Sequence, residues 1–421
     1  MTALIRAHLR GVGLREVSGS PAGTTNKLAS TVSHAIQWFP MHARHLNAPE
    51  YAVTGTELRP SPRLIVYRTR LEQNISLMRR YLESVVPSSG FLHITPHVKT
   101  HKSLWVTRLL MESGVKRFKC SLNELDMCLE AEAPDIFVAY PLLPSDADRV
   151  AERIAQNPGQ HVTVQVGCEK HAEYLDRAAR RHGVEIDCLL DLNVGYNRTG
   201  IVPERASDLA RFLPRLPALR FRGIHAYAGH NESADPAERE SCSRRTMATV
   251  VECLRALEST GVEVERIVVA GTPGFLGDLY ELVVRHRVAA RVEVSPGTWV
   301  YWDGHYEGLL PGLFEFAALI LAQVIDLPAP GLLTLNVGSK RWSVDKGPLR
   351  LFSAPGLEVV STSEEHTVLR CSSSAGIEVG DRVLAAPQHV CPTVNLWETF
   401  TIVGEEGRLE KAAEPVTARN R

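Results

Sequence analysis

The sequence predicts an α/β protein in which a (β/α)8 TIM barrel precedes a C-terminal all-β domain. Three observations predict this fold. Eight short apolar runs alternate with helix-like segments between residues 91 and 297. Polar residues and small-residue turns directly follow several of these runs. After about residue 305, strand-like runs succeed one another without good helices between them. Eight strand and helix repeats are typical of a barrel, whose active site lies at the carboxyl ends of its strands.

Composition and charge exclude several classes of protein. The 47 Lys and Arg residues nearly balance the 48 Asp and Glu residues, and no basic block stands out, which argues against a nucleic-acid or anionic-membrane partner. No apolar run is long enough to cross a membrane, and the first residues lack the apolar core of a secretory signal. The eight cysteines are scattered without a C-x-x-C pair. We therefore expect a cytoplasmic protein with reduced thiols.

The chain divides into three predicted parts, of which the first two are a lead-in and the barrel. Residues 1–58 carry weak signals and are expected to be a partly ordered lead-in. The barrel is expected over residues 59–305, beginning with a strand at 64–67 and an amphipathic helix at 71–85. The expected barrel strands are 91–99, 117–121, 135–140, 161–166, 187–194, 221–229, 266–271 and 291–297. Helices are expected between them at 122–133, 171–183 and 244–261.

A doubly wound open sheet is the alternative for this part of the chain. It would require a glycine-rich turn after the first strand, and the sequence has none there. The barrel is therefore the better prediction.

Residues 306–421 form the third part, a predicted β domain. Its strand-like runs are punctuated by turns and lie at 313–327, 332–340, 356–372, 381–391 and 398–404. We expect the strand at 64–67 to join this domain.

Lys99 stands between His97 and His101 at the end of the first expected barrel strand. A lysine close to other cationic groups can be held partly neutral and act as an amine nucleophile or Schiff-base former. These residues alone fit a solvated basic loop better, because histidine and lysine are common in surface turns. The ends of the later strands favour the functional interpretation.

Polar and small residues gather where the later strands end. Asp191 and Arg198 follow the fifth strand, and Tyr227 lies at the end of the sixth. The seventh and eighth strands run into the turns Gly271-Thr272 and Gly297-Thr298, whose backbone N–H groups suit a phosphate. Singly, each is explained by an ordinary turn, a surface ion pair or core packing. Together with Lys99, they predict a site for pyridoxal 5′-phosphate (PLP).

The β domain carries a second candidate site at His389-Val390-Cys391. On a strand, residues two apart point to the same side, and imidazole with thiolate suits zinc. A lone H-x-C is a weak signal, because cysteine is often a small buried apolar residue. Two protein ligands would leave open positions, which is typical of a catalytic metal.

Eight sequence blocks, in order, resemble the signature blocks of the D-threonine aldolase and eukaryotic-type D-serine dehydratase family, which has the alanine-racemase-like fold. The resemblance covers roughly residues 60–405, and the blocks are PHVKTHKS, LDLNVGYNRTG, GIHAYAGH, AGTPGF, SPGTWVYWD, LNVGSK, SEEH and PQHVCPTVNLW. It implies a PLP enzyme, with a divalent metal (Zn or Mn), that forms homodimers.

The resemblance also implies a role for each candidate residue. Lys99 matches the Schiff-base lysine, Arg198 the arginine at the phenolic oxygen of PLP, and Tyr227 the residue near the ring. The phosphate-binding turns match Gly271, Thr272, Gly297 and Thr298. The metal ligands match His389 and Cys391.

The sequence departs from the family pattern at two places that we expect near the substrate pocket. Asn336 stands where the family block carries an aspartate, and Trp299 and Trp302 are bulkier than usual. These changes bear on the substrate more than on the cofactor.

Within the family, two reactions of D-3-hydroxy amino acids stay open. We favour retro-aldol cleavage to glycine and an aldehyde, because Trp299 and Trp302 fit a pocket remodelled for a substrate other than D-serine. The H-x-C pair also fits a dehydratase, which yields a 2-oxo acid and ammonia. A non-catalytic PLP carrier would have no use for His389 and Cys391.

Overall fold

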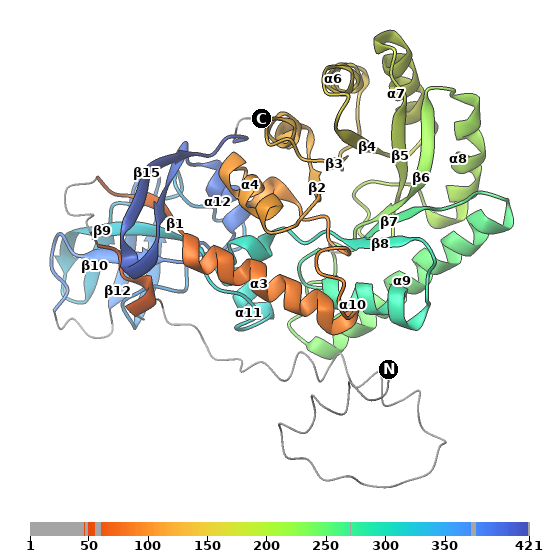
Figure 1. Ribbon diagram of the computed structural model, residues 1–421. Coiled ribbons are helices and arrows are strands. Elements are labelled where there is room, and N and C mark those ends of the chain that lie inside the picture. Colours follow the sequence, from red (N-terminus) through yellow and green to blue (C-terminus); the bar gives the residue numbers. More distant parts are fainter. Residues whose placement is uncertain (1–45, 47–48, 55–59, 270, 372–375, 420–421) are drawn as a thin grey trace, which may run out of the picture. The chain divides into compact units, whose positions relative to one another are not determined.

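The computed structural model describes residues 46, 49–54, 60–269, 271–371 and 376–419 (Figure 1). The described residues belong to one unit, Pro40–Arg421. The predicted lead-in, residues 1–58, lies mostly outside the described residues. Its described part includes the 3-10 turn η1 (Pro49–Tyr51). No helix among the described residues is long and apolar enough to span a membrane.

Seven parallel strands form a curled sheet within the described residues, in the order β2-β3-β4-β5-β6-β7-β8. Their bounds are β2 Arg117–Cys120, β3 Asp135–Val138, β4 His161–Val166, β5 Ile186–Leu192, β6 Leu219–Ala226, β7 Arg266–Val269 and β8 Arg291–Val294. Their residues are mostly buried, because parallel strands are covered on both faces. These seven strands lie where the sequence predicted them.

The prediction of a regular strand at 91–99 is wrong. The segment nevertheless lies between β8 and β2 and closes the sheet into a barrel. Thr95 N–H donates to the Val294 carbonyl of β8 (2.9 Å), and Lys119 N–H of β2 donates to the Pro96 carbonyl (2.9 Å). Pro96 has no N–H to continue a ladder. The chain therefore turns into the 3-10 turn η2 (Val98–Thr100), and Lys99 lies in this turn.

Helices lie along the outer side of the curled sheet (Figure 1). Helix α3 buries Leu71, Ile75, Met78 and Leu82 at helical spacing. In α9, Pro236 takes the first position, and Asp235 accepts a hydrogen bond from Ala237 N–H (2.9 Å). The α-helices are α3 Arg68–Val85, α4 Leu104–Glu112, α5 Leu125–Glu130, α6 Pro144–Gln156, α7 Glu169–His182, α8 Ala206–Phe212, α9 Pro236–Ser259, α10 Phe275–Leu279 and α11 Gly304–Leu309. Shorter turns are η3 Leu122–Glu124, η4 Pro203–Arg205, η5 Leu213–Arg215, the π-helical η6 Tyr280–Arg285 and η7 Thr298–Val300.

A second, largely antiparallel sheet has the order β11-β12-β10-β9-β1-β14-β15, and β13 also pairs with β9. Strand β1 lies between β9 and β14, so the strand at 64–67 joins this sheet as predicted. The bounds are β1 Arg63–Tyr67, β9 Ala318–Ala329, β10 Leu332–Leu335, β11 Leu357–Thr362, β12 Thr367–Cys371, β13 Arg382–Ala385, β14 Thr399–Val403 and β15 Leu409–Pro415. This region also contains α12 (Val390–Asn395) and the 3-10 turn η8 (Glu405–Gly407).

The predicted strand at 381–391 is too long. Strand β13 ends at Ala385, and α12 begins at Val390, whose N–H donates to the buried carboxylate of Asp303 (3.1 Å). Pro392 fits the first turn of a helix, where its missing N–H has no partner to lose. His389 and Cys391 therefore lie at the start of a helix rather than on one side of a strand.

Candidate active site

The turn η2 places Lys99 at the carboxyl end of the barrel. His97 caps this turn, and its Nδ1 accepts a hydrogen bond from Lys99 N–H (3.3 Å). Burial and the charges of Lys99 and Lys119 hold the pKa of His97 well below its usual value. A neutral His97 that accepts at Nδ1 carries its proton on Nε2. The turn thus presents a lysine beside an uncharged imidazole.

A second lysine lies in the same site, and the sequence did not single it out. Lys119 of β2 is 4% exposed. Its Nζ lies 2.7 Å from His225 Nε2 and 3.1 Å from Ser295 Oγ. Burial and the charge of Lys99 lower the pKa of Lys119 to about 7, against the attraction of Asp191.

His225 and Asp191 form a buried pair across β5 and β6. His225 Nδ1 lies 2.7 Å from Asp191 Oδ1, and Gln165 donates to Asp191 Oδ2 (3.2 Å). Burial and the charge of Lys119 lower the pKa of His225 to about 4. The uncharged His225 therefore donates from Nδ1 and accepts at Nε2 from Lys119.

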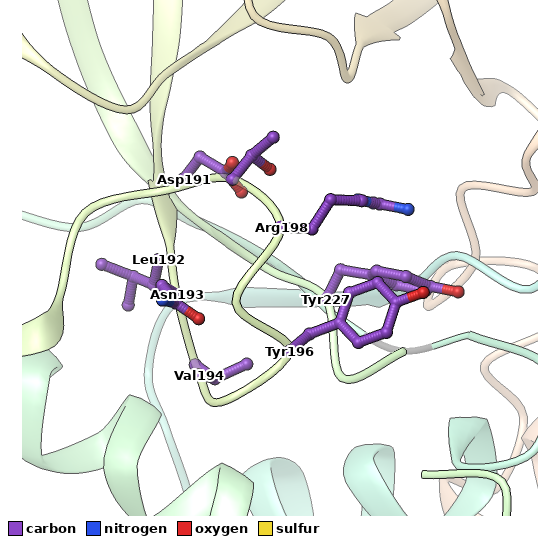
Figure 2. A pocket seen from close by; sticks show the side chains of 8 residues that line it. Asp191, Leu192, Asn193, Val194, Tyr196, Arg198 and Tyr227 are labelled. Carbon is purple, nitrogen blue, oxygen red and sulfur yellow. The ribbon is translucent and has the colours of Figure 1, made fainter. Parts of the chain in front are cut away.

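Arg198 and Tyr227 meet beside this pair. The Arg198 guanidinium lies 4.9 Å from the centre of the Tyr227 ring, and Tyr196 packs edge-on against Tyr227 at 5.5 Å. Figure 2 shows the three side chains extending to the same side of a small pocket that Asp191 also lines. Two of the predicted cofactor residues are thus brought together.

The two predicted phosphate turns are closely packed. A Cβ on Gly271 would lie 3.0 Å from the Tyr227 ring, and one on Gly297 would lie 2.8 Å from both the His97 carbonyl and Thr100 Oγ1. A side chain at Gly297 would therefore displace η2, which we call the lysine turn because it contains Lys99. Thr272 and Thr298 are buried beside these glycines. Phosphate binding by these turns stays a prediction.

Cys391 lies beside the lysine turn. Its Sγ is 3.2 Å from Thr100 Oγ1 and 3.7 Å from Thr298 Oγ1. Burial raises the pKa of Cys391, but the hydrogen bond from His389 and the charge of Lys99 bring it below its usual value. His389 lowers the pKa of Cys391, so the two side chains lie close together although the expected strand is absent. A lowered thiol pKa favours the thiolate, which is the form that binds metals.

His389 is held from its other side by the loop that precedes β11. Its Nδ1 lies 2.6 Å from Asp345 Oδ2, and Lys346 in the same loop pairs with Glu232 after β6 (2.8 Å). Burial alone would lower the pKa of His389, but Cys391 and Asp345 raise it to about 9. A carboxylate on one ring nitrogen is the usual support of a metal-binding histidine. No group of three or more potential ligands occurs within the described ranges.

Three residues expected near the substrate pocket lie elsewhere. Trp299 and Trp302 are completely buried and pack against Phe314, and their indole N–H groups donate to Pro296 and Glu307. Asn336 binds Gln323 N–H and the Ser61 hydroxyl in the second sheet. These side chains build the core, so the prediction that they remodel a pocket is wrong.

The comparisons with known proteins agree with this geometry. The model described as "Alanine racemase, N-terminal domain" matches residues 66–303, which is more than half of the chain. The chain belongs to the alanine-racemase-like family. Members of this family are PLP-dependent enzymes. A second model, described as "Putative serine dehydratase domain", matches residues 317–403.

Several members of the alanine-racemase-like family are similar along most of their length. The 3-hydroxy-D-aspartate aldolase of Paracoccus denitrificans is 27% identical over 86% of this chain and 92% of its own. The D-threonine aldolase of an Arthrobacter species is 25% identical over 82% and 89%. The D-serine dehydratase of Saccharomyces cerevisiae is 20% identical over 83% and 94%. The crystal structure of D-threonine aldolase from Filomicrobium marinum aligns with a TM-score of 0.78 at 25% identity, over 86% of this chain and 96% of that one.

Proposed function

We propose that this protein is a PLP- and divalent-metal-dependent aldolase that cleaves D-3-hydroxy amino acids of the D-threonine type into glycine and an aldehyde. The observation that carries the proposal is the contact between Cys391 Sγ and Thr100 Oγ1 (3.2 Å). This contact places Cys391, a proposed metal ligand, beside Thr100, the residue that follows Lys99. The aldolases among the relatives support the same reaction, and the likeness to catalysts leaves no support for a non-catalytic carrier.

The residues at the carboxyl end of the barrel fit PLP. Lys99 would hold the aldehyde carbon, and Arg198 and Tyr227 would hold the ring. The phosphate would bind to Gly271, Thr272, Gly297 and Thr298. The fit rests on the surplus of cations that Lys99, Lys119 and Arg198 provide at this end of the barrel. PLP, when bound, supplies an electron sink for the substrate.

The donor set of His389 and Cys391 fits zinc better than manganese, because thiolate is a soft ligand and Mn²⁺ prefers oxygen ligands. Cys391 is biased toward the thiolate by His389 and Lys99, and Asp345 orients the imidazole of His389. A divalent ion there would act as a Lewis acid toward the β-hydroxyl of the substrate. The two protein ligands leave coordination positions for that hydroxyl.

The protein's own groups provide the proton transfers. Lys99 Nζ would hold a proton for the reaction in a site where His97 is neutral. Thr100 contacts the Cys391 sulfur and so fixes the distance between the lysine turn and the start of α12. Lys119 and His225 are buried in the same site.

Dehydration of the same substrates is the second candidate. The H-x-C pair favours it. A D-threo-3-hydroxyaspartate dehydratase from Delftia shares the fold, with a TM-score of 0.74 at 20% identity, and a cysteine-to-alanine variant of it is described in a metal-free form. In that reaction the β-hydroxyl leaves and the Cα–Cβ bond stays.

We also propose a homodimer, a cytoplasmic location, and the division into a barrel at 59–305 and a β domain at 306–421. The dimer follows from the family resemblance. The free cysteines support a reduced environment, since all eight lie in the described residues without a disulfide.

Product analysis tests the proposed reaction. The purified protein, supplied with PLP and zinc or manganese, is incubated with D-threonine and with D-3-hydroxyaspartate. We expect glycine and an aldehyde. Ammonia with a 2-oxo acid would instead establish the dehydratase, and no product from a PLP-loaded, metal-loaded protein would contradict both.

A further inference from the structure

Glu232 and Lys346 form an ion pair between two loops that are distant in the sequence. Glu232 lies in the loop after β6, and Lys346 lies in the loop that precedes β11. Lys346 Nζ donates to Glu232 Oε2 (2.8 Å). The Glu232 side chain is 33% exposed and the Lys346 side chain 31% exposed, so a small molecule can reach both. An ion pair this accessible contributes little to stability, so stability alone does not explain why the two loops carry it.

Two sets of contacts place this ion pair beside the proposed metal ligand His389. Asp345 directly precedes the lysine of the pair, and its Oδ2 lies 2.6 Å from His389 Nδ1. On the other side, His305 Nε2 lies 3.6 Å from Glu232 Oε2. The backbone N–H of His305 donates to the carbonyl of Gln388 (3.0 Å), the residue before His389. Both members of the ion pair are therefore held next to the proposed metal site.

The charges of the site agree with this placement. Burial raises the pKa of Tyr227, and the charges of Glu232 and Cys391 raise it further, so the carboxylate and the thiol both lie near that ring. His305 and Lys346 lower the pKa of Glu232 to about 2, against the effect of burial. Glu232 therefore stays negatively charged at neutral pH.

The proposed reaction brings the substrate side chain to this place. A metal at His389 and Cys391 would hold the β-hydroxyl of the substrate. The other substituent is bonded to the same carbon atom, so it must lie close to the metal ligands. Lys99 and Arg198 are already assigned to the cofactor. The ion pair thus supplies charged side chains where the substituent on Cβ would lie.

The ion pair favours one charge type of substituent. A lysine without a partner would attract a carboxylate, but the amine of Lys346 is already bonded to Glu232. A carboxylate on Cβ would therefore meet the like charge of Glu232 and compete with it for the amine. An uncharged substituent meets no such repulsion. A carboxamide could also accept from Lys346 and donate to Glu232.

We propose that the Glu232–Lys346 ion pair determines specificity for the group on Cβ, and that it selects an uncharged substituent, such as methyl or carboxamide, over a carboxylate. The inference rests on the proposed function, because it requires the β-hydroxyl to be held at His389 and Cys391. It adds the class of side chain that this function leaves open. Glu232 and Lys346 would act on the choice of substrate rather than on the bond that breaks.

The wild-type protein gives the first test. D-3-hydroxyasparagine and D-3-hydroxyaspartate of the same configuration have nearly the same shape and differ in charge. The value of kcat/KM is measured for each with the PLP- and zinc-loaded protein, from substrate consumption. We expect the amide to be preferred by about 10-fold or more. Equal values, or a preference for the carboxylate, would overturn the inference. Consumption of neither compound, nor of D-threonine, would instead contradict the proposed function.

Variants of the ion pair give the second test. Glu232→Gln leaves the amine of Lys346 available, so the ratio of the two kcat/KM values should shift toward the carboxylate by about 10- to 100-fold, as expected for a gained charge-assisted hydrogen bond. Adding Lys346→Met should cancel this shift. Glu365→Gln is the matched control, because Glu365 pairs with the exposed Lys340 (3.0 Å), and it should leave the ratio unchanged. Equal losses for both substrates in Glu232→Gln would show that the ion pair only joins two loops, and would overturn the inference.

Discussion

The two ends of the barrel both bury charged groups, but they compensate them differently. At the amino end, Arg266 pairs with Glu293 (2.8 Å) and Asp135 (3.0 Å). At the carboxyl end, Lys119 lies within reach of Lys99 and has a neutral histidine and a hydroxyl as its direct partners. The amino end is an ion-pair network, whereas the carboxyl end has a surplus of cations.

This difference separates a stabilising region from a binding region. A network of paired charges needs no ligand, whereas uncompensated cations favour an anion such as a phosphate. Cavity size does not make this distinction. A cavity of about 290 Å³ lies at the amino end beside Arg266, and one of about 10 Å³ lies beside Arg198 and Tyr227. The difference in charge compensation therefore supports the proposal that the cofactor binds at the carboxyl end.

The largest expected effect is at the carboxyl end, for Cys391→Ala. Cleavage should fall by about 10³-fold, because Lewis-acid catalysis contributes several kcal/mol. The PLP absorbance should remain while bound metal is lost. Metal content, absorbance and product formation are measured on one preparation. Cys168→Ala is the control, since that half-buried cysteine precedes α7 and its side chain makes no capping hydrogen bond. Full activity in Cys391→Ala would refute the metal assignment.

Glu293→Gln tests the amino end. Glu293 is fully buried and pairs with Arg117 (3.1 Å), Arg266 (2.8 Å) and Arg291 (2.6 Å). Its neutralisation should lower the free energy of unfolding by about 3–5 kcal/mol, with little effect on cleavage by the folded protein. Denaturant unfolding measures the loss. The exposed Glu265→Gln should cost about 0–1 kcal/mol. If Glu293→Gln unfolded with a normal free energy but no longer cleaved the substrate, the contrast between the two ends would be contradicted.

The smallest expected effect concerns His161 and pH. The carboxylates of Asp135, which lies 3.7 Å from Nδ1, and Asp187, which lies 2.7 Å from Nε2, raise the pKa of His161 to about 9. A raised pKa in the folded state gives stability that is present below about pH 6.5 and is lost as the pH rises to about 9. Because the ring is half exposed, the contribution should stay below about 1 kcal/mol.

His161→Asn should remove this pH dependence. The free energy of unfolding is compared between the two proteins from pH 6 to 9.5, and their difference isolates His161. Lys119, whose lowered pKa makes stability rise above about pH 7, titrates in both. A difference that stays constant with pH would contradict the assignment.

The sequence predicted the barrel, its order of strands and the joining of the strand at 64–67 to the second sheet. The hydrophobic pattern was enough to predict these strands, because each apolar run forms one buried strand. It failed at residues 91–99, where Pro96 interrupts the ladder. It also failed at 381–391, where Pro392 could have indicated the first turn of a helix.

The site was predictable only in part. Lys99, Arg198 and Tyr227 lie in recognisable blocks next to strand ends. Lys119 lies in an ordinary strand pattern, and its contact in the candidate site is with His225, which is 106 positions away in the chain. The prediction for Trp299 and Trp302 failed for the converse reason. They lie beside a predicted phosphate turn, but their rings pack into the core with Phe314. Long-range packing, rather than local pattern, decides such cases.

The most direct test is to find which lysine carries the cofactor. The PLP-loaded protein is reduced with borohydride and digested, and the pyridoxyl group is located by mass spectrometry. We predict that it lies on Lys99, in the turn beside Cys391. A pyridoxyl group on Lys102 or Lys119, or on no lysine of this end of the barrel, would contradict the account.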